Sequence, residues 1–111
     1  RGVGVGVGTV LRSGWDDKAF DSVLLCEVLE HCIDVPAAVN ELHRILTDGG
    51  TLIIIDKNVQ RLASWSGGIP PWEQWFDCGE LAALLQEIMD IESVSGNERE
   101  LADLVEARLS A

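Results

Sequence analysis

The stretch from Phe20 to Asn58 restricts the fold more than any other part of this 111-residue chain. It begins with an apolar run at residues 23–25 that is bounded by polar residues. A run of this length is typical of a strand buried on both faces. Asp34 then suits the N-cap of a helix, and Pro36 suits its first turn. The order of these signals predicts a strand over residues 20–28 followed by a helix.

The predicted helix carries one apolar stripe at helical spacing, and Gly49-Gly50 is expected to end it. The stripe consists of Val35, Val39, Leu42 and Leu46. Thr51 to Ile55 then forms a second short run typical of a buried strand. Strand, helix and strand make one βαβ unit, with parallel strands and a right-handed crossover. The predicted fold class is α/β, a partial Rossmann-like, doubly wound parallel sheet.

The flanking segments give weaker signals. Gly2 to Gly8 alternates glycine with valine, which predicts a strand that its glycines weaken. We expect loops over residues 12–19 and 57–71. Asp77 with Glu80 forms a capping box for a second helix.

The last part of the chain also carries a helix signal. Ser95 with Glu98 is a second capping box. Apolar residues follow it at helical spacing: Leu101, Leu104, Val105 and Leu109. We therefore predict a C-terminal helical extension of the sheet.

Charge and cysteine content exclude several classes of partner. The net charge of −11 repels nucleic acid and anionic membrane, so neither is expected as a partner. No apolar stretch approaches the ~20 residues that cross a bilayer. The three cysteines are odd in number and form no C-x-x-C pair. Reduced thiols and a cytoplasmic location are expected, without a disulfide framework or structural zinc site.

The run FDSVLLCEVLEH, followed by DVPAAVNELHRILTDGGTLIIIDKN, resembles the class I S-adenosylmethionine-dependent methyltransferases. That family has an acidic-ended strand, a helix with E-x-x-R-x-L and a Gly-Gly turn into the next strand. The matching positions are Phe20, Asp21, Val23, Glu27, Leu29, Glu30, His31, Asp34, Pro36, Glu41, Arg44, Leu46, Gly49 and Gly50. Residues 70–87, which begin with PPWEQWF, are also similar to the family.

The resemblance implies S-adenosylmethionine as cofactor and a methyl acceptor of unidentified class. Ligands of open parallel sheets bind beyond the carboxyl ends of the strands. There the resemblance places Cys26 and Glu27 beside the cofactor. It also places His31 as a general base or a residue that orients the substrate. The alternative, which we favour for these residues, is that Glu27 and His31 hold the loop and Cys26 is a small packing residue.

The family's cofactor turn is a G-x-G-x-G sequence that follows a strand and opens a helix. Gly2 to Gly8 is not preceded by a strand or followed by a helical pattern. By register, residues 4–9 match the strand and turn before Phe20-Asp21. Where the family often has Gly-Asp, this chain has Gly8-Thr9. We therefore expect residues 1–87 to be an incomplete domain that lacks the cofactor-binding first half and is inactive alone.

Residues 88–111 resemble a different family. The sequence DIESVSGNE followed by a helical pattern is similar to the N-terminal segment of succinyl-diaminopimelate desuccinylase-like zinc metallopeptidases. Asp90, Ser93, Ser95, Gly96 and Glu98 carry this resemblance. An ordinary capped amphipathic helix is the alternative. The two histidines, His31 and His43, both precede this tail, so we predict no metal site.

Three functions remain open. The chain is a methyltransferase-like domain, a non-catalytic α/β fragment, or a fragment of a desuccinylase-type fusion. The non-catalytic fragment would act through a partner chain or through self-association at an exposed sheet edge. Trp72 and Trp75 could form a substrate surface, although we expect them to cover an edge of the core.

Overall fold

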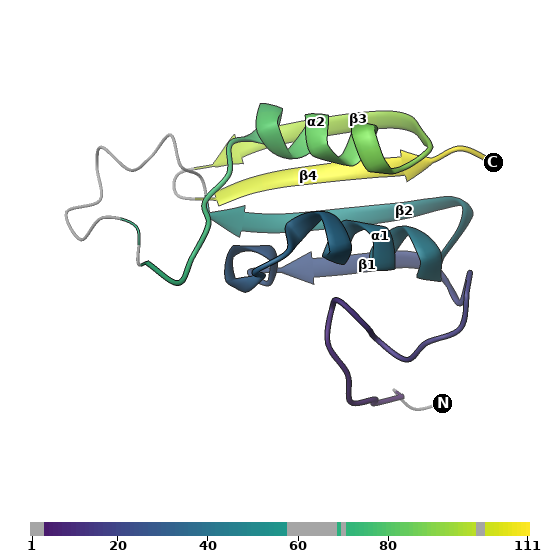
Figure 1. Cartoon of the computed structure of the whole chain (residues 1–111). Coiled ribbons are helices and arrows are strands. Elements are labelled where there is room, and N and C mark those ends of the chain that lie inside the picture. Colours follow the sequence, from purple (N-terminus) through teal and green to yellow (C-terminus); the bar gives the residue numbers. More distant parts are fainter. Residues whose placement is uncertain (1–3, 58–68, 70, 100–101) are drawn as a thin grey trace.

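The computed structural model describes residues 4–57, 69, 71–99 and 102–111. It forms a four-stranded mixed sheet in the order β1-β2-β4-β3, with two helices packed on one face (Figure 1). The elements are β1 (Phe20–Cys26), the 3-10 turn η1 (Leu29–His31), α1 (Val35–Ile45), β2 (Leu46–Lys57), α2 (Cys78–Ile88), β3 (Ile91–Arg99) and β4 (Ala102–Leu109). This architecture confirms the predicted α/β class and a partial Rossmann-like sheet. The sheet is mixed rather than parallel throughout as predicted, because β4 is antiparallel to both of its neighbours.

The βαβ unit forms as predicted. β1 and β2 pair in parallel, and the Asp34 carboxylate accepts a hydrogen bond from Ala37 N at 3.0 Å to cap α1. The predicted end of this helix at Gly49-Gly50 is wrong, because α1 ends at Ile45 and β2 begins at Leu46. Leu46 is buried and pairs with Phe20 across the sheet. The boundary between α1 and β2 is therefore set by the burial and strand pairing of Leu46 rather than by Gly49-Gly50.

The second helix confirms its capping box. The Asp77 carboxylate accepts a hydrogen bond from Glu80 N at 2.7 Å, and α2 begins at the next residue, Cys78. Leu81 and Leu85 lie on its buried face. Both helices therefore start at the predicted caps and direct their apolar stripes to the same face of the sheet.

The helix predicted for the tail is wrong, because residues 91–99 and 102–109 are the strands β3 and β4. β4 lies between β2 and β3 and is antiparallel to both. Its buried side chains alternate along the strand: Val105, Ala107 and Leu109. Glu106 and Arg108 lie between them and are less buried. Pairing on both edges of β4 outweighs the helical spacing that the same residues also show.

The strand predicted over Gly2 to Gly8 does not form in residues 4–8. An isolated antiparallel bridge between Thr9 and Arg12 follows the segment. Glycine loses more conformational freedom on ordering than other residues, which opposes a strand here. Residues 1–3 of the predicted strand, and 58–68 and 70 of the predicted loop, lie outside the described residues.

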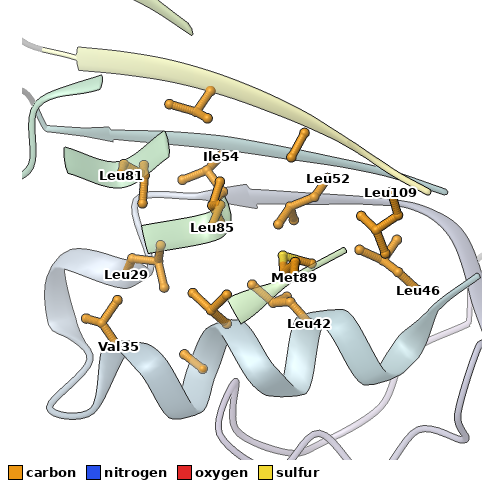
Figure 2. Close-up of a cluster of buried hydrophobic side chains, with 14 residues drawn as sticks. Leu29, Val35, Leu42, Leu46, Leu52, Ile54, Leu81, Leu85, Met89 and Leu109 are labelled. Carbon is orange, nitrogen blue, oxygen red and sulfur yellow. The ribbon is translucent and has the colours of Figure 1, made fainter. Parts of the chain in front are cut away.

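The core lies between the helices and the sheet (Figure 2). Leu29, Leu42, Leu52, Ile54, Leu81, Leu85, Val105 and Leu109 are among its buried residues. In the part of the chain that the structure describes, no helix covers the other face of the sheet (Figure 1). Leu24 on that face is 62% exposed. Among the same residues, no helix is long and apolar enough to span a bilayer.

Candidate functional site

The chain leaves β1 through a strained residue at the carboxyl edge of the two parallel strands. Glu27 has a φ of 54°, a conformation that costs a non-glycine residue roughly 1–2 kcal/mol. Its backbone N donates a hydrogen bond to Ile55 O at 2.7 Å, which ties the turn to β2. The chain then enters η1, which carries Glu30 and His31. Strain of this kind concentrates at functional sites, where the surrounding structure maintains it.

Five ionisable residues meet at this edge, and we call them the carboxyl-edge cluster: Glu30, His31, Asp56, Lys57 and Glu73. Lys57 Nζ lies 2.9 Å from Glu30 Oε2 and 2.9 Å from Glu73 Oε1. His31 Nε2 lies 3.4 Å from Glu30 Oε1. The Glu30 side chain is 2% exposed, whereas that of His31 is 53% exposed. The cluster therefore joins a buried carboxylate to an imidazole that solvent and ligands can reach.

Asp56 supports the cluster from below. One carboxylate oxygen accepts a hydrogen bond from Glu30 N at 3.2 Å, and the other accepts one from Lys57 N at 2.9 Å. Burial raises the pKa of Asp56 to about 6, and the charges of Glu30 and Glu27 add to the effect. The two backbone hydrogen bonds oppose that rise. Asp56 thus fixes the backbone on both sides of the cluster while its own charge is disfavoured.

The segment before α2 closes the cluster from the side. Gln74 N donates to Glu30 O at 2.8 Å, and its side-chain amide donates to Cys32 O at 2.9 Å. Phe76 N donates to Lys57 O at 3.3 Å. These bonds hold residues 73–76 against both η1 and the end of β2.

Glu73 and Trp75 complete the surroundings of the Lys57 ammonium. Trp75 Nε1 donates to Glu73 Oε1 at 3.0 Å, and the ammonium lies 5.8 Å from the centre of the Trp75 ring. The hydrogen bond from Lys57, followed by that from Trp75, lowers the pKa of Glu73. The close contacts of its ammonium with Glu73 and then Glu30 raise the pKa of Lys57. Trp75 is buried and covers the core edge as predicted, whereas Trp72 is 71% exposed.

The residues predicted from the sequence, Cys26, Glu27 and His31, lie at and directly after the end of β1. Cys26 is exposed and is not the small packing residue of the alternative interpretation. Asp56, Lys57 and Glu73 also belong to the site and were not predicted from the sequence. The signal for Asp56 was available, because a buried acid directly follows the apolar run at the end of β2. Glu73 carried no comparable signal, since only the fold brings it to η1.

A second polar network lies at the other end of α1. The Glu41 carboxylate accepts hydrogen bonds from Ser13 N at 2.8 Å, Ser13 Oγ at 2.6 Å and Arg44 Nε at 2.8 Å. Arg44 also donates to Asp17 at 2.6 Å and to Trp15 O at 2.7 Å. The bonds from Arg44 and then Ser13 lower the pKa of Glu41 to about 2. The E-x-x-R pattern in α1 therefore anchors the segment before β1.

That segment encloses a cavity of about 260 Å³ with β1 and α1. Its walls include Gly8, Val10, Trp15, Val23, Leu25 and Leu42. No residue of the carboxyl-edge cluster lines it. The cavity is mainly apolar and carries no titratable group besides Glu41, so we place the candidate chemistry at the carboxyl edge.

S-adenosylmethionine, the cofactor that the resemblance implies, would bring two positive groups to this edge, its sulfonium and its amino group. The exposed Glu27 carboxylate is the side chain that would pair with them. The turn for the rest of the cofactor has no counterpart in residues 4–19. There the glycine-rich segment is followed by the Thr9–Arg12 bridge and a loop, and no helix opens. The described residues thus fit the methionine end of the cofactor only.

Comparison with known proteins agrees with the resemblance seen in the sequence. Residues 2–54 match the family model described as a methyltransferase domain. No curated protein matches the sequence. A methyltransferase from Thermotoga maritima, described as a possible histamine N-methyltransferase, is similar in structure with a TM-score of 0.74 at 18% identity. The match covers 91% of this chain and 61% of that one.

Two further solved structures show the breadth of the fold. A putative Haloferax volcanii methyltransferase, solved in complex with the Trm112 methyltransferase activator, has a TM-score of 0.74 at 15% identity, over 94% of this chain and 60% of that one. The [4+2]-cyclase SpnF has a TM-score of 0.74 at 14% identity, over 96% and 55%. At these identities the likeness shows the fold, which also carries a reaction other than methylation.

These matches bear on two predictions, the missing cofactor-binding half and the metallopeptidase-like tail. The chain spans about 60% of the length of the first two structures it matches. The family match begins at residue 2, in the glycine-rich segment, which weighs against the expectation that the cofactor-binding half is missing. The three matches described above cover 91%, 94% and 96% of the chain, so most of the tail falls within the same fold. The predicted resemblance of residues 88–111 to metallopeptidases has no support here.

Proposed function

We propose that this chain, which has the fold of a class I S-adenosylmethionine-dependent methyltransferase domain, takes part in methyl transfer. Its acceptor would lie over the carboxyl edge, beside His31. One observation carries the proposal: an accessible imidazole lies 3.4 Å from a buried carboxylate at the edge where open sheets bind ligands.

In this proposal His31 is the general base and Glu30 positions it. S-adenosylmethionine, when bound, supplies an activated methyl group. His31 accepts the proton that the acceptor loses, because its imidazole is half-exposed and can reach a ligand. Glu30 orients the imidazole from its buried side. Asp56 holds the backbone of Glu30 in place, so the pair is positioned before a ligand arrives.

Cys26 and Glu27 would hold the cofactor's methionine end. Cys26 is the last residue of β1, and Glu27 is the strained residue that follows it. The exposed Glu27 carboxylate can pair with the cofactor's ammonium group. The strained backbone keeps this carboxylate at the edge rather than along the strand direction.

Calorimetric titration with S-adenosylmethionine tests the proposal. We expect the unmodified chain to bind the cofactor. Glu27→Gln should raise the Kd about tenfold, because it removes one charge-assisted hydrogen bond. His31→Gln should bind the cofactor unchanged and lose methyl transfer. Glu87→Gln, a change on the exposed face of α2, is the matched control. No heat at millimolar cofactor would rule out cofactor binding by this chain.

A second function is association with another copy of the chain, and the uncovered sheet face favours it. Leu24 on that face is 62% exposed and pairs across the sheet with Ile53, which is half-buried. β1 is also an edge strand in the described sheet. Exposed edges and apolar faces promote self-association. Sedimentation should show a dimer that Leu24→Glu weakens, and a clean monomer would count against this function.

A further inference from the structure

Three side chains in the carboxyl-edge cluster have the geometry of a ligand set. The ligand atoms of Glu30, His31 and Glu73 all lie within 4.8 Å of one another. Zinc binds imidazole nitrogen and carboxylate oxygen at roughly 2.0–2.2 Å. Three atoms this close need only small side-chain movements to share one ion.

The buried carboxylate of Glu30 is only partly compensated by its neighbours. Glu30 is 2% exposed, and its Oε2 has no hydrogen-bond partner among the described residues. The Lys57 ammonium lies 2.9 Å from that oxygen, in a direction that does not make a hydrogen bond. A buried carboxylate is stable only when a charge and hydrogen bonds compensate it. Its Oε2 here has the charge alone.

The Lys57 ammonium occupies a position where a cation is stabilised, and the flexible side chain allows it to leave that position. Its ammonium is in contact with Glu30 and Glu73, two of the three residues of the ligand set. Its side chain is 31% exposed, so the long stem can swing the ammonium into solvent. Two carboxylates with one lysine leave a net charge of −1, whereas the same carboxylates with a divalent ion are neutral.

We propose that the carboxyl-edge cluster is a zinc-class divalent-cation site, in which Glu30, His31 and Glu73 are the ligands and Lys57 is the competing cation. A mixed set of one imidazole and two carboxylates suits zinc, and three protein ligands leave a coordination position open. Trp75 orients the Glu73 carboxylate from outside the ligand set. No metal site was predicted from the sequence, because Glu73 reaches η1 only through the fold.

Titration with zinc by calorimetry tests the site in the unmodified chain, without cofactor or acceptor. We expect one ion per chain. Lys57→Gln removes the competing charge and should tighten binding about tenfold or more, whereas His31→Gln and Glu73→Gln should weaken it by at least about tenfold. His43→Gln, a histidine on α1 outside the cluster, is the matched control and should bind as the unmodified chain does. Circular dichroism of each variant separates lost binding from lost folding.

Cobalt(II) provides a second readout that distinguishes this site from the thiols. We expect visible d–d bands that disappear in His31→Gln, without the near-ultraviolet charge-transfer band of a thiolate ligand. Zinc binding that is unchanged in His31→Gln and Glu73→Gln, or a thiolate band with cobalt, would overturn the proposal. The proposal would also be overturned if Lys57→Gln folds normally but binds zinc no more tightly than the unmodified chain. A bound ion would occupy His31 and Glu30, so zinc is expected to inhibit the proposed methyl transfer. If the chain binds no zinc, the proposed methyl transfer is unaffected, because it uses the same residues without a metal.

Discussion

Replacing Glu41 by glutamine tests whether α1 anchors the segment before β1. The change keeps the shape of the side chain and removes its charge. Glutamine has one acceptor oxygen where the carboxylate has two, and its amide would face the Arg44 donors. We therefore expect the bonds to Ser13 and Arg44 to be partly lost and the free energy of unfolding to fall.

The size of the loss follows from the pKa of Glu41. A carboxyl group whose pKa falls from 4.5 to about 2 on folding contributes up to roughly 3 kcal/mol. The Glu41 side chain is 10% exposed, but its partner Arg44 is 37% exposed, so solvent screens part of the interaction. We expect Glu41→Gln to lower the free energy of unfolding by about 1–2 kcal/mol at pH 7.

The pH dependence distinguishes this charge effect from a packing defect. The folded state lowers the pKa of Glu41, so the stabilisation is complete above the unfolded value of 4.5. It is lost as the pH falls through the folded value of about 2. The difference between the two proteins should therefore be constant above pH 5 and shrink as the pH falls toward 3.

Urea unfolding followed by circular dichroism measures this difference at each pH. Glu87→Gln on the exposed face of α2 is the matched control and should change stability by less than about 0.5 kcal/mol. A difference of zero at pH 7, or one that stays the same down to pH 3, would refute the anchoring role.

Three other predictions concern stability. Burial raises the pKa of Asp56 to about 6, so the folded state binds more protons there. The free energy of unfolding should therefore fall by up to about 3 kcal/mol as the pH rises from 4 to 6. Asp56→Asn should abolish this pH dependence, and NMR of the side-chain carboxyl groups measures the pKa of Asp56 directly. Leu85→Ala opens a cavity in the core and should cost about 2–5 kcal/mol in urea unfolding, against less than about 1 for the exposed Leu24→Ala. Glu27→Gly relieves the positive φ and should raise the melting temperature while it weakens cofactor binding.

The βαβ unit was predictable because its signals are local. The Asp34 cap, the apolar stripe of α1 and the short apolar runs each depend on neighbours within one element. The tail was not predicted, because its residues fit two periods at once. Val105, Ala107 and Leu109 alternate as in a strand, while Leu101, Leu104 and Val105 are spaced as in a helix. Only the position of β4 between two strands decides for the strand.

The candidate site was predictable in part for the same reason. His31 and Glu27 follow the end of a recognisable strand, so the carboxyl-end rule places them at the edge. Glu73 comes from the far side of a loop, and its contact with Lys57 depends on bonds that Gln74 and Phe76 make to η1 and β2. The pairing of Glu41 with Ser13 likewise requires the fold, although the E-x-x-R pattern marked one of its partners.

The position of β4 also has a consequence for the order in which the chain folds. β3 has no contact with β2 in the sheet except through β4. The βαβ unit and the β3–β4 hairpin are each local in sequence and can form quickly by themselves. Their union requires β4 to close a long loop across α2, which is the slow, entropically costly step. The sheet therefore assembles as two halves that dock late, and mutations in β4 should slow folding more than those in β1.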